Sequence, residues 1–111
     1  KGSRVSDALC ELIDLNATFC EFAGLGPQAG IDARSLAPVL KEETDTHREE
    51  TVAALQNFRC IRTATHKYIK NYNDVDELYD LSQDPDELHN IADTSPELIA
   101  NLSRRLRQRL G

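Results

Sequence analysis

The stretch "TVAALQNFRCIRTATHKYIKNYNDVDELYDL", residues 51–81, changes the periodicity of the chain and decides its fold. It contains four short runs rich in β-branched and aromatic residues, namely TVAALQ, FRCIRTA, KYIKNY and ELYDL. Polar breaks separate the runs, and this pattern is typical of antiparallel strands joined by tight turns. The break "ATH" is short enough for a hairpin, and "NDVD" suits a turn before the last run. We therefore predict a four-stranded antiparallel sheet within residues 51–81.

One helix is predicted after this sheet. Ser95 can cap its start, and Pro96 stands at the first helical position, where proline is well tolerated. Leucines then repeat every four residues along one face, at Leu98, Leu102, Leu106 and Leu110. An apolar stripe of this kind must be covered, and one face of the predicted sheet is the nearest cover. The expected fold class is therefore α+β, with a small antiparallel sheet packed by a C-terminal helix.

The first part of the chain has a helical period instead. Between Asp7 and Ala23 apolar residues recur at three- and four-residue steps, as in an amphipathic helix that Gly24 can end. The apolar positions are Leu9, Leu12, Ile13, Phe19, Phe22 and Ala23. A loop with Gly and Pro follows, and we predict a second, short helix that ends at Leu40. Residues 41–50, KEETDTHREE, are so highly charged that we expect a solvated connector.

Composition limits the classes of function. A chain of 111 residues fits one compact unit, and its net charge of −6 provides no broad cationic surface for nucleic acid. We expect no membrane span either, because no apolar stretch approaches the length of about 18 residues that a span requires. The three cysteines are an odd number and include no CxxC pair, so neither a disulfide framework nor a zinc site is predicted.

Acidic residues gather in and before "ELYDLSQDPDELHNIA", residues 77–92, which raises the question of a metal site. The carboxylates are Asp74, Asp76, Asp80, Asp84 and Asp86. A calcium-binding EF-hand loop starting at Asp74 would need glycine at its sixth position, where Tyr79 stands. We therefore predict a solvated turn and no metal ligand. The histidines lack ligand-like spacing, and no GxSxG or other activated nucleophile is present, so no catalytic residue is assigned.

The order of the segments resembles the C-terminal end of formylglycine-dependent arylsulfatases, which belong to the alkaline-phosphatase superfamily. "KGSRVSDALCELIDLNATFCEFAGLG" matches the family pattern "kGsrvdd…vs.vDlaPTlLdlaGl", and "GIDARSLAPVL" matches "dGrSLlPlL". The strand pair with "iRT…yKYi" and the closing "ELYDLe.DPgE..NLA" also have counterparts here, the latter nearly letter for letter. At residues 16–18, Asn-Ala-Thr replaces the usual Ala-Pro-Thr. The resemblance covers the whole chain.

The resemblance implies that the full-length protein is a sulfuric ester hydrolase. Its formylglycine, formed within a C-x-P-S-R motif, and its calcium ligands would precede this segment. Cys10, Cys20 and Cys60 are not followed by that motif, so none of them qualifies as the modified residue. Residues 1–45 would be the tail of the large α/β catalytic domain, and residues 46–111 a C-terminal subdomain.

The same resemblance implies a scaffold without catalytic residues, which is inactive alone and completed by the rest of the parent chain. The candidates for a substrate-binding residue at the pocket rim are His47 and His66. The substrate would be a small sulfated molecule. Because the parent domain's cover is missing, we expect the helix of residues 7–23 to drive homodimer formation of the chain alone.

Two other interpretations remain open. The chain would also suit a phosphonate monoester hydrolase, because those enzymes share this C-terminal plan, or a free-standing module that binds a protein partner. Because the sequence begins at Lys1 and has no Met, we expect that the protein continues upstream. A periplasmic, secreted or cytoplasmic location is therefore equally open.

Overall fold

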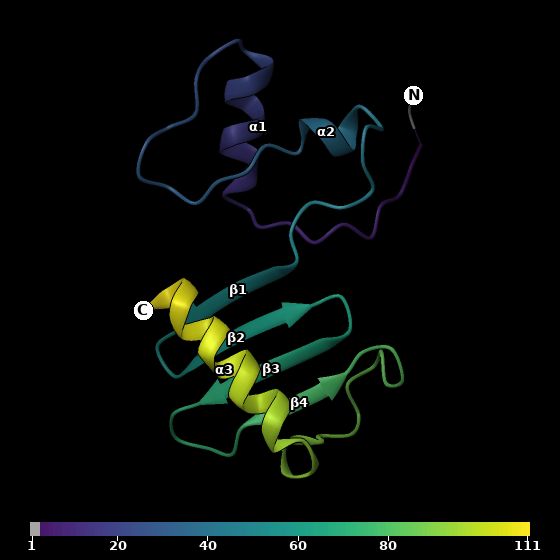
Figure 1. Ribbon diagram of the computed structural model, residues 1–111, viewed down its shortest axis with the longest axis vertical. Helices are drawn as coiled ribbons and strands as arrows, with labels where there is room; N and C mark the ends of the chain where they lie inside the picture. Colours follow the sequence, from purple (N-terminus) through teal and green to yellow (C-terminus); the bar gives the residue numbers. More distant parts are fainter. Residues whose placement is uncertain (1–2) are drawn as a thin grey trace. The chain divides into compact units, whose positions relative to one another are not determined.

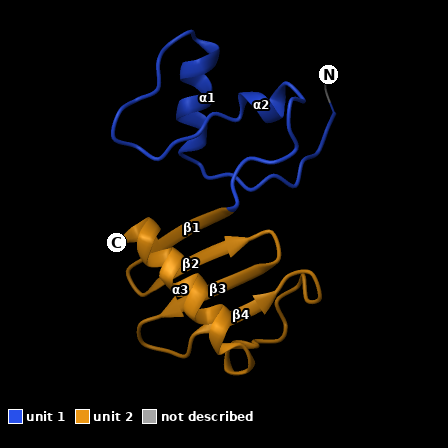
Figure 2. Cartoon of the chain, viewed as in Figure 1, with its two compact units in different colours: residues 1–49 blue, residues 50–111 orange. Residues whose placement is uncertain are grey.

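The computed structural model describes residues 3–111, which form two compact units, Lys1–Glu49 and Glu50–Gly111 (Figure 2). We call them unit 1 and unit 2. Unit 1 extends to Glu49 because His47 and Arg48 bind the Asp14 side chain. The division of the parent enzyme's domains after residue 45 stays a prediction. Within residues 3–111, none of the helices combines the length and the apolar character needed to cross a membrane.

Unit 2 is built on the predicted antiparallel sheet, whose strand order is β1-β2-β3-β4 (Figure 1). The strands are β1 Glu50–Leu55, β2 Phe58–Thr63, β3 His66–Asn71 and β4 Glu77–Asp80. Each strand pairs with the next one along the chain, as expected when short turns join consecutive runs. The four-stranded meander and the α+β class are thus confirmed.

The register of the sheet places one apolar residue from each strand in a single row. Val52 pairs with Ile61, Ile61 with Tyr68, and Tyr68 with Leu78. Because side chains alternate between the two faces of a strand, all four lie on the same face. Ile61, Tyr68 and Leu78 are at most 1% exposed, and Val52 packs against them.

Helix α3, Pro96–Leu110, covers this face, as the leucine stripe predicts (Figure 1). The helix begins after Ser95, whose carbonyl oxygen accepts a hydrogen bond from the N–H of Ile99 at 3.1 Å. Leu102 and Leu106 complete the buried core, and Leu98 and Leu110 pack at its margin. A short 3-10 helix, η1, at Ala92–Thr94 leads into α3.

Unit 1 contains two short helices, α1 Asp14–Phe22 and α2 Ala37–Leu40. Gly24, with φ of 73°, follows α1 in the left-handed conformation that ends many helices. Leu9 pairs with Arg48 in an isolated antiparallel bridge, so the chain before α1 is extended. The predicted helix start at Asp7 is therefore wrong. Tertiary pairing with the connector overrides the helical period of residues 7–13.

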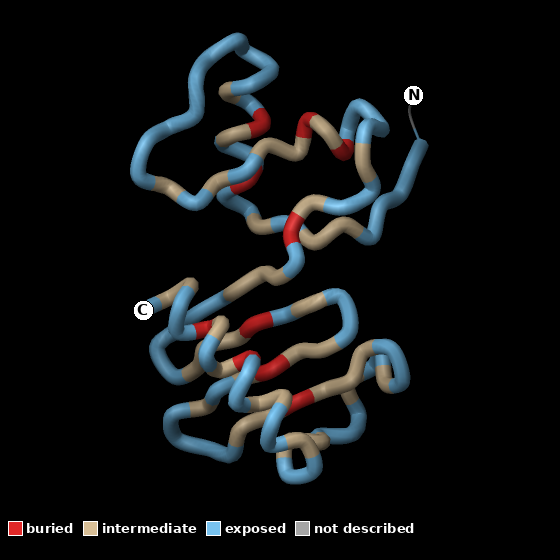
Figure 3. The backbone as a smooth tube through the Cα atoms, in the orientation of Figure 1, coloured by how far each residue is buried: buried red, intermediate tan, exposed pale blue. Residues whose placement is uncertain are grey.

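Few residues between 3 and 49 are buried, as the colours in Figure 3 show, and three of them, Asp14, Thr18 and Arg48, are polar. Ala37 and Val39 are buried, whereas bulky apolar residues of α1 and of the turn before it are exposed to solvent. The exposed fractions are 84% for Leu12, 67% for Phe19 and 57% for Phe22. Polar interactions must therefore hold much of unit 1 together.

We predict that Leu102→Ala destabilises unit 2 by about 2–5 kcal/mol, because it removes a buried leucine from beneath the sheet. The protein's 3 tyrosines all lie in unit 2, so urea unfolding followed by tyrosine fluorescence reports on this unit alone. Leu88→Ala is the matched control because Leu88 is 73% exposed. A cost below about 0.5 kcal/mol for Leu102→Ala would contradict the packing of the leucine stripe.

Candidate functional site

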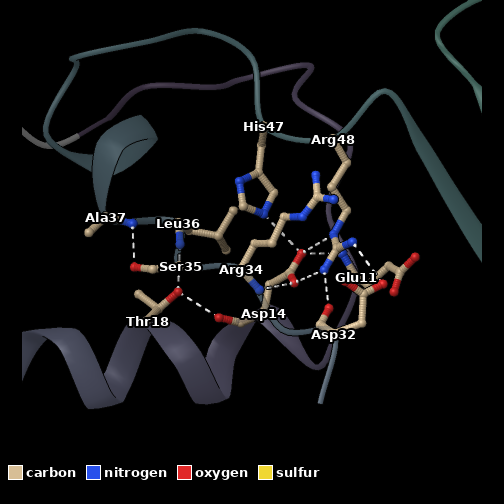
Figure 4. Close-up of polar contacts among 10 residues, drawn as sticks. All are labelled: Glu11, Asp14, Thr18, Asp32, Arg34, Ser35, Leu36, Ala37, His47 and Arg48. Atoms are coloured by element: carbon tan, nitrogen blue, oxygen red, sulfur yellow. Dashed lines mark hydrogen bonds and ion pairs between the residues drawn. The ribbon is translucent and has the colours of Figure 1, made fainter. Parts of the chain in front are cut away.

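The most concentrated polar cluster of unit 1 surrounds Asp14, the first residue of α1 (Figure 4). Its carboxylate is fully buried. Arg48 binds it with two nitrogens, at 2.9 Å from Nε to Oδ2 and 2.5 Å from Nη2 to Oδ1. This parallel two-point contact is the strongest geometry for an arginine and a carboxylate.

Asp14 also accepts hydrogen bonds from three other groups. The backbone N–H of Glu11 donates to Oδ2 and that of Arg34 to Oδ1, both at 2.9 Å. Nε2 of His47 lies 3.0 Å from Oδ2. A carboxylate can only accept, so the histidine donates in this contact. One buried carboxylate therefore connects the turn before α1, the loop before α2 and the connector after α2.

Four neighbouring contacts extend the same connections, and Figure 4 marks interactions among these residues with dashed lines. Nη2 of Arg48 donates to the backbone oxygen of Asp32 at 2.6 Å, and Nη1 lies 3.6 Å from the Asp32 carboxylate. The Thr18 hydroxyl donates to the backbone oxygen of Asp14 at 2.7 Å. It also accepts the N–H of Leu36 at 2.8 Å, just before α2. Asp14 and Thr18, one turn apart on α1, thus hold the segment that leads to α2.

The electrostatics of this cluster favour a permanent ion pair. Burial on its own would raise the pKa of Asp14, but the hydrogen bonds from Arg48, Glu11, Arg34 and His47 hold that pKa well below its ordinary value of 3.8. The bond to Asp14 in turn raises the pKa of Arg48. The pair stays charged at neutral pH. Nε and Nη2 of Arg48 and both oxygens of Asp14 are bound to protein groups, whereas Nη1 is buried without a hydrogen bond, 3.6 Å from the Asp32 carboxylate. We therefore interpret it as a structural ion pair, since a general acid or base must be free to exchange a proton with a substrate.

The two histidines predicted for a pocket rim lie in different units and surroundings. The His47 side chain is 7% exposed and is bound to Asp14. His66 begins β3 directly after the turn at Ala64 and Thr65, and its side chain is 23% exposed. Its Nδ1 lies 2.8 Å from the Thr65 hydroxyl, and its Nε2 lies 3.9 Å from Asp80. A substrate-binding role for either residue stays a prediction.

The carboxylates near residues 77–92 organise the backbone of a turn. Asp84 accepts the N–H groups of Leu88 and His89 at 3.0 and 2.9 Å, and these bonds lower the pKa of Asp84. Asp80 accepts hydrogen bonds from the hydroxyl and the N–H of Ser82, which lower its pKa as well. In the part of the chain that the structure describes, no three His, Cys, Asp or Glu side chains are grouped closely enough to hold a metal ion. We assign no calcium ligand here.

The pairing of Asp14 with Arg48 is absent from the predictions made from the sequence. A charged residue at Asp14, between the apolar residues Ile13 and Leu15, is the signal that reveals it in retrospect. Aspartate is rarely fully buried unless it is paired. The partner remained hidden because Arg48 lies in a highly charged segment that is typical of solvated connectors.

We predict that Asp14→Asn destabilises unit 1, because it leaves the Arg48 guanidinium buried without its counter-charge. Loss of one partner of a buried pair costs about 3–5 kcal/mol. Hydrogen exchange at the N–H of Arg34, which donates to Asp14, should therefore be much faster in the variant. The folded-state pKa is lowered, so the wild-type contribution is present above pH 3.8 and is lost as the pH falls below it. The variant should lack this acid dependence.

The control for this experiment is Asp45→Asn, which removes the same charge from a carboxylate that is 96% exposed. It should leave exchange at Arg34 almost unchanged, because surface ion pairs contribute little. Equal exchange rates in the two variants would refute the structural role of Asp14.

Comparison with known proteins gives one consistent family. The family model described as "N-sulphoglucosamine sulphohydrolase, C-terminal" matches residues 1–111. An N-acetylglucosamine-6-O-sulfatase of Bacteroides thetaiotaomicron is 34% identical over 82% of this chain and 19% of its own length. Human arylsulfatase K is 30% identical over 95% of this chain and 22% of its own. The chain therefore spans about a fifth of the length of these relatives.

Solved structures agree with this result. A protein solved in complex with its substrate D-glucosamine-2-N,6-O-disulfate has a TM-score of 0.68 at 32% identity, covering 87% of this chain and 22% of that one. A phosphonate monoester hydrolase of Agrobacterium radiobacter has a TM-score of 0.62 over 86% of this chain and 23% of that one, at 23% identity, and this likeness shows the fold alone. The chain belongs to the sulfatase family and corresponds to the C-terminal domain of its members.

Proposed function

We propose that this chain is the C-terminal portion of an enzyme that hydrolyses sulfuric esters, and that it acts there as scaffold. The observation that carries the scaffold role is the Asp14 cluster, in which the buried charges are bound to groups of the chain itself. A residue that performs catalysis must be free to meet a substrate. The enzyme class rests on the named sulfatases, whose length is about five times the part that matches this chain.

The chemistry of hydrolysis would then belong to residues upstream of Lys1. In such an enzyme a formylglycine and a calcium ion would supply the reacting groups, and we place neither in this segment. The contribution of residues 3–111 is to fold the C-terminal sheet and helix α3 and to hold α1 and α2 in position. His66 is our candidate for the pocket rim, because its ring is more exposed than that of His47.

The exposed apolar face of α1 supports the idea that the rest of the parent chain is the natural partner. Phe19 and Phe22 of α1 and Leu12 of the turn before it are each more than half exposed. Burying apolar surface is worth about 25 cal/mol per Å², so a stable protein rarely leaves several such residues of one segment in water. We propose that the upstream part of the enzyme covers this face.

Hydrolysis of a phosphonate ester is the second candidate function. We keep it because the phosphonate monoester hydrolase of Agrobacterium radiobacter has a similar fold. The two hydrolases are distinguished by the full-length enzyme's relative rates on an aryl sulfate and an aryl phosphonate monoester. A free-standing interaction module is the third interpretation. An upstream reading frame with the C-x-P-S-R motif would refute it.

We predict that the 111-residue chain alone shows no hydrolysis of an aryl sulfate above buffer, even with added calcium, because the reacting groups lie upstream. The full-length enzyme, produced with its formylglycine, should hydrolyse the same compound. Release of the phenol, followed by absorbance, measures both. Turnover by the chain that survives repurification and disappears when one of its own residues is replaced would overturn the proposal.

We also predict that the chain alone self-associates through α1, since its apolar face has lost the proposed cover. Sedimentation velocity should show a dimer that Leu12→Glu with Phe19→Glu converts to monomer. Both side chains are exposed, so charge is tolerated in the folded monomer. Val75→Glu with Leu88→Glu is the control in unit 2, where exposures are 70% and 73%. A wild-type chain that stays monomeric at high concentration would contradict this prediction.

A further inference from the structure

A hollow with cationic walls lies in unit 2 beside the end of α3. Its volume is about 210 Å³. Five polar side chains line it, namely Arg59 of β2, Lys70 of β3, Tyr72 just after β3, and Ser103 and Arg107 of α3. Leu106, whose side chain belongs to the core, provides an apolar part of the lining. The volume is below the range of about 300–1,000 Å³ typical of sites for drug-sized ligands, so it suits one small group.

The fold itself brings these cations together. Arg59 and Lys70 are direct partners in the β2–β3 register. Each lies two residues from a core residue of the same strand, Ile61 or Tyr68, so strand alternation places both on the face that α3 covers. Ser103 and Arg107 are four residues apart and therefore share one side of the helix.

Arg59 and Arg107 are held by neighbours that carry no negative charge. Nε of Arg59 donates to the Tyr72 hydroxyl at 2.7 Å, and its guanidinium lies 6.0 Å from the centre of the Tyr72 ring. Nη1 of Arg107 donates to the Ser103 hydroxyl at 3.1 Å. A guanidinium carries five N–H donors, so each of these bonds uses only one of them. Both arginines are thus oriented and keep their charge for another partner.

Two carboxylates offset part of this charge. Asp76 lies 3.3 Å from Nζ of Lys70 and also accepts the hydroxyl of Tyr68 at 2.9 Å. Gly111, which carries the terminal carboxylate of the 111-residue chain, also lines the hollow. Three cations therefore face two carboxylates. This local excess of positive charge occurs in a protein whose net charge is −6. Such an excess attracts anions.

We propose that this hollow binds a sulfate group carried by a saccharide. The arginines offer several N–H donors to the sulfate oxygens, and Lys70 adds a third positive charge. Tyr72 is 54% exposed, so its ring provides a flat apolar surface beside the anion on which the C–H face of a sugar ring can pack. The saccharide class rests on the proposed function in sulfate ester hydrolysis, whereas the anion site rests on the hollow alone.

The test is a titration of the 111-residue chain with three probes, followed by amide chemical shifts in NMR spectra. The probes are D-glucosamine-2-N,6-O-disulfate, unsulfated D-glucosamine and inorganic sulfate. The disulfate should shift the amide signals of the lining residues and bind at least about tenfold more tightly than either other probe, because only it joins the anion to the sugar ring. Added sodium chloride should weaken this binding.

Matched variants locate the binding. Arg59→Gln and Arg107→Gln should each weaken disulfate binding about tenfold. Arg62→Gln removes the same charge from the opposite face of β2, and Arg104→Gln does so from an exposed position on α3. Both controls should stay within about twofold of the wild type, since neither side chain lines the hollow. Tyr72→Ala should weaken the disulfate more than inorganic sulfate, because it removes the ring surface for the sugar as well as the hydroxyl that holds Arg59.

Three results would overturn the proposal. One is the absence of saturable shifts at the lining residues. Another is equal weakening by Arg59→Gln and Arg62→Gln, which would indicate general charge attraction. The third is equal affinity for inorganic sulfate and the disulfate, which would reduce the hollow to a plain anion site. Hydrolysis plays no part in this titration. If the chain binds the disulfate but the full-length enzyme is inactive, only the proposed function is refuted. If the full-length enzyme is active but the chain does not bind the disulfate, only the role of the hollow is refuted.

Discussion

The burial of the Asp14 carboxylate is the constraint on which unit 1 depends. A charge withdrawn from water is strongly unfavourable unless opposite charge and donors replace the lost solvent. Here Arg48, His47 and two backbone N–H groups do so, and they come from segments before α1, before α2 and after α2. Satisfying one carboxylate therefore fixes the course of most of the unit. The same demand explains why the chain around Leu9 is extended and pairs with Arg48.

The two units are held together by different interactions. Unit 2 has a row of apolar residues across its strands, closed by Leu102 and Leu106, so the hydrophobic effect stabilises it directly. Unit 1 buries an ion pair and leaves Leu12 and Phe19 exposed. A buried ion pair contributes specificity of arrangement more readily than net stability. This contrast is the physical basis for our proposal that unit 1 continues into a larger domain, whereas unit 2 has its own core.

Much of unit 2 follows from the sequence because its signals are local. The runs between residues 51 and 81 alternate with short polar breaks, and the four-residue spacing of Leu98, Leu102 and Leu106 reveals the buried face of α3. Unit 1 depends on an interaction between residues 14 and 48, which no local pattern encodes. The helix start was wrong for the same reason. The hollow was not predicted either, since Arg59 and Arg107 meet only when the register and the position of α3 are known.

The scaffold role is tested most directly by the turnover number of the full-length enzyme carrying Asp14→Asn, measured on an aryl sulfate and expressed per folded molecule. If the ion pair only holds unit 1 together, the variant should unfold at a lower temperature but turn over at the wild-type rate while it is folded. Its KM should also remain unchanged. A turnover number that falls about tenfold or more in fully folded enzyme would contradict the account, because Asp14 would then contribute to the chemistry.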